Sequence, residues 1–507
     1  MCKFVTSFVT SFMKGDPMSI FSEHLHRLIT QANISVSRLS RETGIDRSYI
    51  QKFLNGSRIP SSESYVTKIC HSLQLTSRQR TEFVNSYRIA RVGETSYSHF
   101  LAVKEFIENI QDINMSHTVS VSLPSGDVPP IPAQPNVEAL QGSININQAI
   151  KLALERECCQ EQPEIYLLIQ PEHVFLNQLL ALLSQTHKNV AIHHFISLDN
   201  DSHSSWDNCY NIRILQAILP MIFNHPNYDA QYCYENVASH FNDNTIFPYA
   251  IITSQTALLL SYDMRTALLS HDEGIREVYR FKFRKLFDSY EPLYQKVDDY
   301  YSYFESMLTP ALQYHDKAIS FQLEPCFGYM ITPDFITEAA NIDYATLDKV
   351  LLLFEQREKY MSQVSDKLKV TAYFTEKGLK NFLKTGRISE CPPELYSPFP
   401  ESIRYDFVKQ LYYGLLGGTL NQEIRLISPS FHIPDNLIIS SHDDNHLLLT
   451  LIQSAGKYLT LSFNETSIVH AFNDFFEYLP LSPWILSHEE TLGVLKKYLP
   501  SKTDTIR

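Results

Sequence analysis

The chain has 507 residues, too many for one ordinary hydrophobic core, and its 44% hydrophobic and 20% charged residues are a globular composition, so we expect two to four domains. No apolar run reaches the roughly 18 residues that cross a bilayer, so we expect no membrane partner. The eight cysteines contain no CxxC pair, which favours reduced thiols in the cytoplasm over a disulfide framework or a zinc site. The net charge of the chain is −13, but it is unevenly distributed: residues 1–92 hold 13 Lys and Arg against 6 Asp and Glu, and the remainder holds 30 against 50. We therefore expect only the start of the chain to bind a polyanion such as a nucleic acid.

The first segment, residues 1–18, reads "MCKFVTSFVTSFMKGDPM". It has an apolar stretch but only one lysine ahead of it and no small-residue cleavage site, which makes it a poor signal peptide. We predict a disordered leader, with Met18 as the expected start of the native protein.

Residues 19–92 are predicted to form a compact helical domain. The first helix is expected to carry an apolar face of Ile20, Leu25, Leu28 and Ile29. Further helices are predicted over 36–43, 46–54, 62–73 and 77–91.

The stretch from Ser35 to Pro60 contains the strongest local signals. Ser35 and Asp46 are good N-caps, because their side-chain oxygens can accept a free N–H of the first helical turn. Gly44 stands where a helix usually ends in a left-handed conformation. Asn55 and Gly56 stop the second helix. The pattern predicts two short helices joined by a tight turn.

The second of these helices is amphipathic. Ile50, Phe53 and Leu54 are expected to face inward, and the opposite stripe contains Arg47, Ser48, Gln51, Lys52 and Asn55. Arg and Lys can donate to guanine, Gln can pair with adenine, and Ser can serve several bases, so the stripe suits a DNA major groove. The exposed N–H groups of the Asn-Gly turn, with Ser57 and Arg58, suit phosphate oxygens.

This stretch resembles the helix-turn-helix of the Cro and lambda-repressor type, the XRE family. The matching residues are Leu39, Ser40, Gly44, Ile45, Arg47-Ser48, Ile50, Asn55-Gly56 and Pro60, followed by the helix "SESYVTKICHSLQL". The resemblance covers about residues 19–85 and implies a regulator that binds double-stranded operator DNA. It places base contacts on Arg47, Ser48, Lys52 and the nearby Gln51, and phosphate contacts near Ser35, Asn55 and Arg58.

Three positions depart from the family pattern. The family usually has Ala where this chain has Ser40, and often has Gln where it has Val36, which puts a DNA contact from position 36 in doubt. It often has Glu where this chain has Leu54, a change that alters the packing under the recognition helix.

The next segments separate this head from the rest of the chain. Residues 93–115 are predicted to form a connecting or dimerising helix, with an apolar face of Phe100, Val103, Phe106, Ile107 and Ile110. Residues 116–143 are predicted to be a Pro/Ser-rich linker, because Ser122–Asn136 holds five prolines in fifteen residues.

The remainder favours a larger mixed α/β body in two halves, 144–320 and 321–507. Strand patterns at 164–170 and 189–197 enclose a helix pattern, which is a strand–helix–strand rhythm. The blocks 249–287 and 436–479 both read as successive strands followed by an amphipathic helix, in which Ile275 and Phe283 match Ile468 and Phe476 in spacing. We interpret this as a weak internal duplication; recurrence of a common α/β pattern is the alternative.

We find no catalytic constellation. The chain lacks GxxxxGK[ST], HExxH and GxSxG, and it has no GxGxxG after a strand. The glycine cluster at 414–418 is expected to serve a tight turn or close helix packing. Cys158-Cys159 and His193-His194 are adjacent pairs whose members are expected to face different ways, which disfavours a redox or metal role.

The body also resembles phospholipase-D-like folds, whose enzymes use paired HxKxxxxD motifs. Here His315 and Lys317 occur, but Gln322 stands where the acid is required, and no second copy exists. We therefore expect no enzyme, no catalytic residue, no cofactor and no metal.

Two functions from different classes remain. The first is a transcriptional regulator that binds operator DNA as a homodimer, with a body that senses a small-molecule or peptide effector or oligomerises. The alternative is an enzyme with a phospholipase-D-like body that acts on DNA or on a small molecule.

Overall fold

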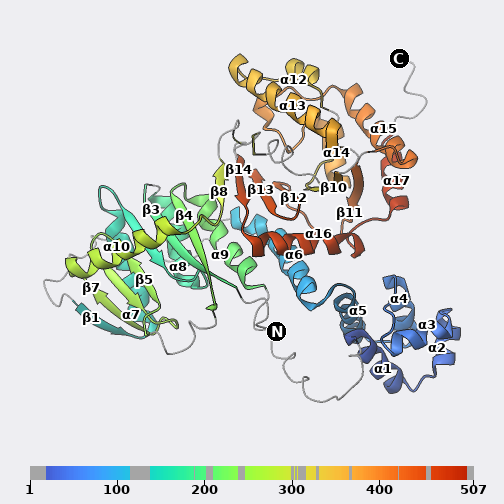
Figure 1. The fold of residues 1–507 in the computed structure, drawn as a ribbon, viewed down its shortest axis with the longest axis horizontal. Helices are drawn as coiled ribbons and strands as arrows, with labels where there is room; N and C mark the ends of the chain where they lie inside the picture. Colours follow the sequence, from blue (N-terminus) through green and yellow to red (C-terminus); the bar gives the residue numbers. More distant parts are fainter. Residues whose placement is uncertain are drawn as a thin grey trace. The chain divides into compact units, whose positions relative to one another are not determined.

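A computed structural model describes residues 19–114, 137–187, 189–200, 209–237, 246–297, 302, 305–306, 316–326, 331–364, 368–420, 422–452 and 458–499. The predicted leader, the proline-rich stretch Ser122–Asn136 and His315 lie outside these residues. The chain divides into two compact units, one ending at Ser98 and the other beginning at His99. The predicted fold class is confirmed, because a helical head is followed by a mixed α/β body (Figure 1).

The head contains the five predicted helices. They are α1 (Ile20–Ala32), α2 (Val36–Thr43), α3 (Arg47–Leu54), α4 (Glu63–Ser72) and α5 (Ser77–Val92). Each begins after a residue whose side-chain oxygen accepts a first-turn N–H, namely Ser19, Ser35, Asp46, Ser62 and Thr76. These caps satisfy backbone donors that the helix itself leaves unpaired, which explains why local sequence located the helix starts well.

One predicted core position of the head is wrong. Ile20 is 48% exposed, whereas the neighbouring Phe21 is fully buried and stacks on Phe83 with ring centroids 5.0 Å apart. The inward stripe of α1 passes through Phe21, Leu25 and Leu28, so the first residue of the helix falls outside it. Burial of a large ring against α5 decides the phase of the helix.

Helix α6 (Glu94–Asn114) follows α5 after Gly93 and carries the predicted apolar face. Its five predicted apolar residues are fully buried: Phe100, Val103, Phe106, Ile107 and Ile110. The Phe100 ring stacks on Phe475 at 5.3 Å, and Phe106 meets Phe472 edge-on at 5.6 Å. This face of α6 therefore packs against aromatic residues of α16.

The described residues of the body form two seven-stranded sheets. The first consists of β1 (Val137–Gln141), β2 (Glu164–Leu168), β3 (Ala191–Asp199), β4 (Tyr228–Glu235), β5 (Tyr249–Ile252), β6 (Ala257–Leu260) and β7 (Thr266–Ser270). The second consists of β8 (Gln295–Val297), β9 (Lys317–Phe321), β10 (Lys369–Thr375), β11 (Gln422–Ile427), β12 (Leu437–His442), β13 (His446–Ile452) and β14 (Tyr458–Phe463).

The two sheets have the same topology. The first runs in the order β1-β7-β6-β5-β2-β3-β4, and the second runs β8-β14-β13-β12-β9-β10-β11. Each strand thus has a counterpart seven strands later. The parallel pairs correspond as well, since β2–β3–β4 and β9–β10–β11 are parallel and the other pairs are antiparallel. Such identity in order and direction is the duplication that the two sequence blocks indicated.

Among the described residues, most helices of the body lie in connections between strands, and α16 (Thr466–Tyr478) and α17 (His488–Lys497) follow the last strand. The first half contains α7 (Ser143–Cys158), α8 (Val174–Thr186), α9 (Tyr210–Asn224) and α10 (Glu273–Ser289), and the second contains α12 (Pro333–Ala339), α13 (Tyr344–Val364), α14 (Glu376–Thr385), α15 (Glu401–Gly417), α16 and α17. Helices α10 and α16 both follow the last strand of their sheet, and Phe283 and Phe476 are buried at the same position of each.

Three strands show that predicted segment boundaries were misplaced. β1 falls within the range predicted as linker and pairs with β7 as an edge strand. β8 falls within the predicted first half but pairs with β14 of the second sheet. β9 also begins before the predicted boundary at residue 321, and it pairs with β10 and β12 of the second sheet. β8 has three residues and β1 five. Such short edge strands carry little periodic signal, because only pairing with a distant partner defines them.

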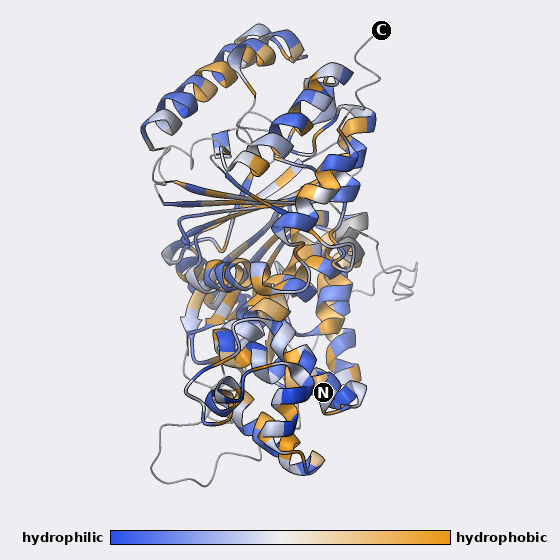
Figure 2. Cartoon of the chain, turned by 90° about the vertical axis from the view of Figure 1, so that its right-hand side faces the viewer, coloured by the Kyte–Doolittle hydropathy of each residue, from blue (hydrophilic) through white to orange (hydrophobic). Residues whose placement is uncertain are grey.

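The described helices carry hydrophilic as well as hydrophobic residues along their length (Figure 2). Among the residues that the structure describes, none of the helices combines the length and the hydropathy that a bilayer span requires.

Candidate nucleic-acid interface and a pocket in the body

The turn between α2 and α3 has the local geometry that its residues predict. Gly44 caps α2 in the left-handed region with φ +68°. The next residue, Ile45, is buried, and the Ser40 hydroxyl donates to its carbonyl oxygen at 2.6 Å. The Asp46 carboxylate then accepts the Ser48 N–H at 2.7 Å and starts α3. The small residue at position 40 therefore ties the turn to the preceding helix, which accounts for Ser in place of the family's usual Ala.

The inner face of α3 anchors the helix in the core of the head. Ile50 and Phe53 are almost fully buried, and Leu54 is also buried. Phe53 meets Phe21 edge-on, with ring centroids 6.4 Å apart. Leu54, which departs from the family pattern, therefore adds to the core. Burying these three side chains favours the folded helix by several kcal/mol, at roughly 1.5–3 kcal/mol each.

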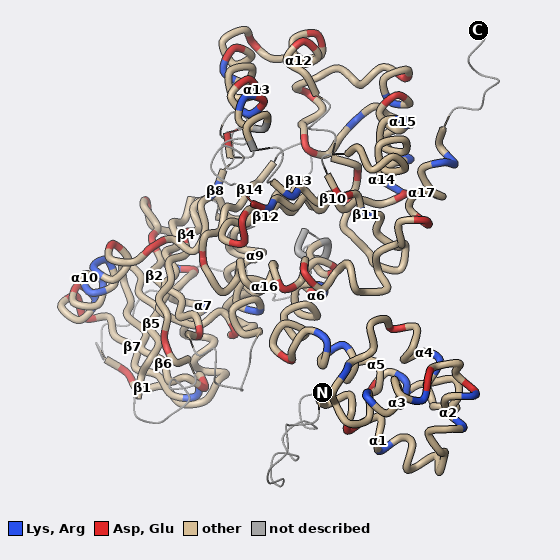
Figure 3. The backbone as a smooth tube through the Cα atoms, turned by 45° about the vertical axis from the view of Figure 1, so that its right-hand side comes forward, with Lys and Arg blue, Asp and Glu red and all other residues tan. Residues whose placement is uncertain are grey.

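The outer face of α3 presents the predicted base-contacting residues together. Arg47, Ser48, Gln51 and Lys52 are all exposed. They occupy the first and second turns of the helix, the part that reaches base edges in helix-turn-helix complexes. Lys and Arg positions, blue along the backbone tube, occur on α2, α3 and α5 of the head (Figure 3).

The predicted phosphate-contacting residues lie at two helix ends. The Ser35 hydroxyl oxygen accepts the Arg38 N–H at 3.3 Å, which leaves its hydroxyl hydrogen able to donate to an anion. The side-chain amide oxygen Oδ1 of Asn55 accepts both the N–H and the hydroxyl of Ser57, at 3.1 and 2.7 Å. The side chain of Asn55 therefore orders the turn after α3, in which Arg58 is exposed.

Tyr49 is a residue of this surface that the sequence reasoning missed. It is 38% exposed on α3, and the Arg58 guanidinium carbon lies 4.8 Å from its ring centroid. The Lys52 ammonium lies 5.9 Å from the same ring. A cation above an aromatic face is held by the ring quadrupole. Tyr49 thus orients two of the predicted DNA contacts, a role that no spacing rule for polar residues would identify.

Comparison with known families agrees with this geometry. Residues 25–75 match the family model of a helix-turn-helix. These residues are a DNA-binding helix-turn-helix domain. The match spans most of α1 through α4 and does not extend into the body.

Whole-chain comparisons add little to this result. No curated protein matches the chain. Among solved structures, a phosphatidylserine synthase from Haemophilus influenzae Rd KW20 is 11% identical, covering 72% of this chain and 92% of its own, with a TM-score of 0.22. The archaeal chromatin protein TrmBL2 is 12% identical, covering 52% and 97%, with a TM-score of 0.21. Yeast tyrosyl-DNA phosphodiesterase is 9% identical, covering 66% and 91%, with a TM-score of 0.19. Scores this low carry no argument about fold or function.

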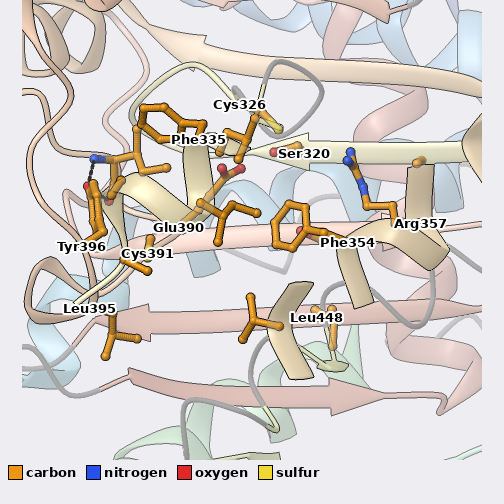
Figure 4. Close-up of a pocket in the computed structure, with 18 of the residues that line it drawn as sticks. Ser320, Cys326, Phe335, Phe354, Arg357, Glu390, Cys391, Leu395, Tyr396 and Leu448 are labelled. Carbon is orange, nitrogen blue, oxygen red and sulfur yellow. Dashed lines mark hydrogen bonds between the residues drawn. The ribbon is translucent and has the colours of Figure 1, made fainter. Parts of the chain in front are cut away.

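The second half of the body contains a pocket of about 240 Å³. It lies against β9, β12 and β13 and is bordered by α12, α13 and the segment before α15 (Figure 4). Its lining is mostly apolar, with Ile319, Phe335, Ile336, Phe354, Tyr396 and Leu448 among its residues. A mostly apolar pocket with a few polar groups is the usual form of a small-molecule site.

Burial shifts the pKa of three ionisable groups of this pocket in the direction that favours their neutral forms. Burial raises the pKa of the Glu390 carboxyl, which favours its protonated form, although the nearby Arg357 opposes the shift. Burial lowers the pKa of His442 to about 4 and raises that of Cys391 to about 12. Figure 4 shows the side chains of Glu390 and Arg357 reaching toward the strand that carries Ser320.

The adjacent histidines and cysteines face different ways, as expected. His194 is buried and bonds the Tyr228 hydroxyl at 2.8 Å, whereas His193 stacks on Tyr166. Cys158 is buried and Cys159 exposed, and burial raises the pKa of Cys158 to about 12.

Two residues of the partial HxKxxxxD match, Lys317 and Gln322, make other contacts. Lys317 begins β9 and its ammonium donates to Asp444 at 2.8 Å, and Gln322 is buried after the same strand.

The glycine cluster at 414–418 ends α15, where Gly418 adopts a left-handed conformation with φ +63°.

Proposed function

We propose that this protein is a transcriptional regulator that binds operator DNA in the cytoplasm through α3. Arg47, Ser48, Gln51 and Lys52 act as base contacts, and Ser35, Asn55, Ser57 and Arg58 hold phosphates. The observation that carries the proposal is the division of α3 into a buried apolar side and an exposed polar stripe directly after the Gly44 turn.

The charge distribution supports the same function. The net charge of residues 1–92 is +7, whereas the remainder is strongly acidic. A duplex therefore attracts the head and repels the body. Binding that neutralises phosphates also releases counterions, so affinity falls steeply as salt rises.

The test is selection of bound duplexes from a random pool by the full chain, followed by affinity measurements at several salt concentrations. The selected sequence should be bound far more tightly than random DNA. The variant Arg47→Ala/Lys52→Ala should lose sequence preference, because each lost base contact costs roughly 1–3 kcal/mol. Both side chains are exposed, so the fold should survive.

A matched control keeps the charge change but moves it to another helix. Arg78 and Arg80 are exposed in the first turn of α5, and Arg78→Ala/Arg80→Ala also removes two positive charges. This control should lose some affinity for all duplexes and keep its sequence preference. Equal sequence preference in both double variants would contradict the assignment of α3 as the reading helix.

We also propose that the regulator acts as a homodimer. A single head offers one short helix to the groove, whereas two heads read half-sites about one helical turn apart. The selected operator should then contain two related half-sites. A single half-site bound by one copy, measured by light scattering of the complex, would show the dimer to be wrong.

The body is proposed to sense a small-molecule effector in the pocket beneath α12 and α13. The apolar lining favours a hydrocarbon body, and the Arg357 guanidinium favours a carboxylate end, because it can donate to both carboxylate oxygens. An apolar carboxylic acid is therefore the effector class. A volume of about 240 Å³ suits a small molecule better than a peptide.

Thermal stability of the full chain tests this effector class. Octanoate should raise the melting temperature, and octylamine and octanol should raise it less. At a hundredfold excess over Kd a ligand stabilises the folded state by about 2.7 kcal/mol. Ile336→Trp, which fills the pocket, should abolish the effect. Equal stabilisation by all three ligands would remove the proposed role of Arg357.

The enzyme alternative lacks a supporting site among the described residues. Lys317 is engaged with Asp444, and Gln322 occupies the acid position of the only partial motif. Turnover of a phosphodiester substrate by purified full chain, lost on Lys317→Ala, would favour that alternative instead.

A further inference from the structure

Three side chains from helices α6 and α16 come together near the beginning of α6. His99 belongs to α6, and His470 and Asp474 belong to α16. The His99 Nδ1 lies 2.6 Å from the Asp474 Oδ2, and the His470 Nε2 lies 3.7 Å from the same oxygen. One nitrogen or oxygen from each residue falls within 4.8 Å of the others.

The local sequence explains this convergence. His470 and Asp474 are four residues apart on α16, so they stand on one face, one turn from each other. His99 precedes Phe100, whose ring packs on Phe475 and Tyr478 of the same helix. These aromatic contacts hold α6 against α16 and thereby fix the His99 ring beside Asp474. The imidazole rings of His99 and His470 meet edge-on with centroids 5.9 Å apart.

Two of the three side chains are buried and the third is exposed to solvent. The side chains of His99 and Asp474 are 11% and 9% exposed, whereas that of His470 is 65% exposed. The buried His99 and Asp474 are already hydrogen-bonded to each other. The exposed His470 adds little to folding at that position, but it supplies a third donor atom directed at the same carboxylate.

Two imidazole nitrogens and one carboxylate oxygen form a donor set for borderline divalent transition metals. Zn²⁺ takes His nitrogens and Asp oxygens at about 2.0–2.2 Å in tetrahedral sites, which places neighbouring ligand atoms roughly 3.3 Å apart. Reaching that spacing needs the 2.6 Å contact to open and the 3.7 Å contact to close, each by less than about 1 Å. Mg²⁺ and Ca²⁺ prefer six or more oxygen ligands and fit this set poorly.

We propose that His99, His470 and Asp474 bind one divalent transition metal ion, with Zn²⁺ as the best-matched metal. The exposed side of His470 leaves the fourth coordination position to water. A bound ion would link α6 to α16 in addition to their aromatic contacts. This proposal goes beyond the regulator function and does not depend on it.

Cobalt provides a direct test, because tetrahedral Co²⁺ absorbs in the visible range. The full chain, prepared without an affinity tag and stripped with a chelator, is titrated with Co²⁺ and then with Zn²⁺. We expect one equivalent of Co²⁺ to bind, with an absorption band that Zn²⁺ abolishes. His470→Ala should weaken binding at least tenfold, since even outer-shell losses cost 10–100-fold.

A matched control is His488→Ala, which removes another exposed histidine, on α17. It should bind Co²⁺ as the unaltered chain does. His470→Gln and Asp474→Asn provide further variants of similar size, so a folding defect in one is distinguished by circular dichroism from loss of a ligand. No stoichiometric Co²⁺ binding, or a spectrum that His470→Ala and His470→Gln leave unchanged, would overturn the proposal.

Discussion

Replacing Gly44 with Ala measures the free energy that the left-handed backbone conformation costs in the turn between α2 and α3. Gly44 has φ +68°, and a Cβ built there meets no heavy atom within 4 Å among the described residues. Steric overlap therefore adds nothing. The left-handed conformation alone costs an L-residue about 1–2 kcal/mol, so we expect Gly44→Ala to destabilise the helix-turn-helix by that amount.

Hydrogen–deuterium exchange on the full chain measures this loss locally. When reclosing is fast, amide exchange follows the population of the open form. A change of 1–2 kcal/mol then accelerates exchange roughly 5- to 30-fold, and the acceleration should appear in the peptides that cover α2 and α3. Global unfolding is a poorer readout of this local change, because its signal sums over two compact units of the chain.

Gly493→Ala is the matched control. Gly493 lies within α17, and a Cβ there also meets no heavy atom within 4 Å among the described residues, but its φ is not positive. Alanine is the better helix former by roughly 1 kcal/mol. This variant should slow exchange in α17 and leave α2 and α3 unchanged. Unchanged exchange of α2 and α3 in Gly44→Ala would refute the assigned cost of the turn.

Three further outcomes are expected. Gly378→Ala should destabilise the second sheet by several kcal/mol, since its Cβ would overlap the Leu323 carbonyl; an unchanged urea midpoint would contradict this. Burial lowers the pKa of His194 to about 4 from 6.5, so its contribution, roughly 3 kcal/mol, is complete above pH 6.5 and is lost as the pH falls toward 4; unfolding titrations of His194→Asn across that range should lack this pH dependence. Iodoacetamide should modify the exposed Cys159 and spare Cys158, whose pKa burial raises to about 12, as peptide mass spectrometry can check.

Local signals in the sequence were sufficient for most of the head. Cap residues, a left-handed glycine and apolar spacing act within a few residues of one another, so the helices, the turn at Gly44 and the exposed stripe of α3 could be predicted. The error at Ile20 has a non-local cause, because contact of Phe21 with Phe83 selects the buried face. Tyr49 was missed because its partner Arg58 approaches only once the chain has turned back after α3.

The body shows how far such local information extends. The two similar blocks indicated a repeat, and strand–helix rhythm indicated an α/β fold. Strand order, the short edge strands β1 and β8, the pocket and the meeting of His99 with Asp474 depended on contacts between residues far apart in the chain. The amino-acid sequence by itself determined where the helices of the head begin and which face of α3 carries the exposed polar stripe, because those depend on neighbouring residues. Only tertiary structure decided which distant side chains share a site, since pairing and burial are made between segments that no local pattern connects.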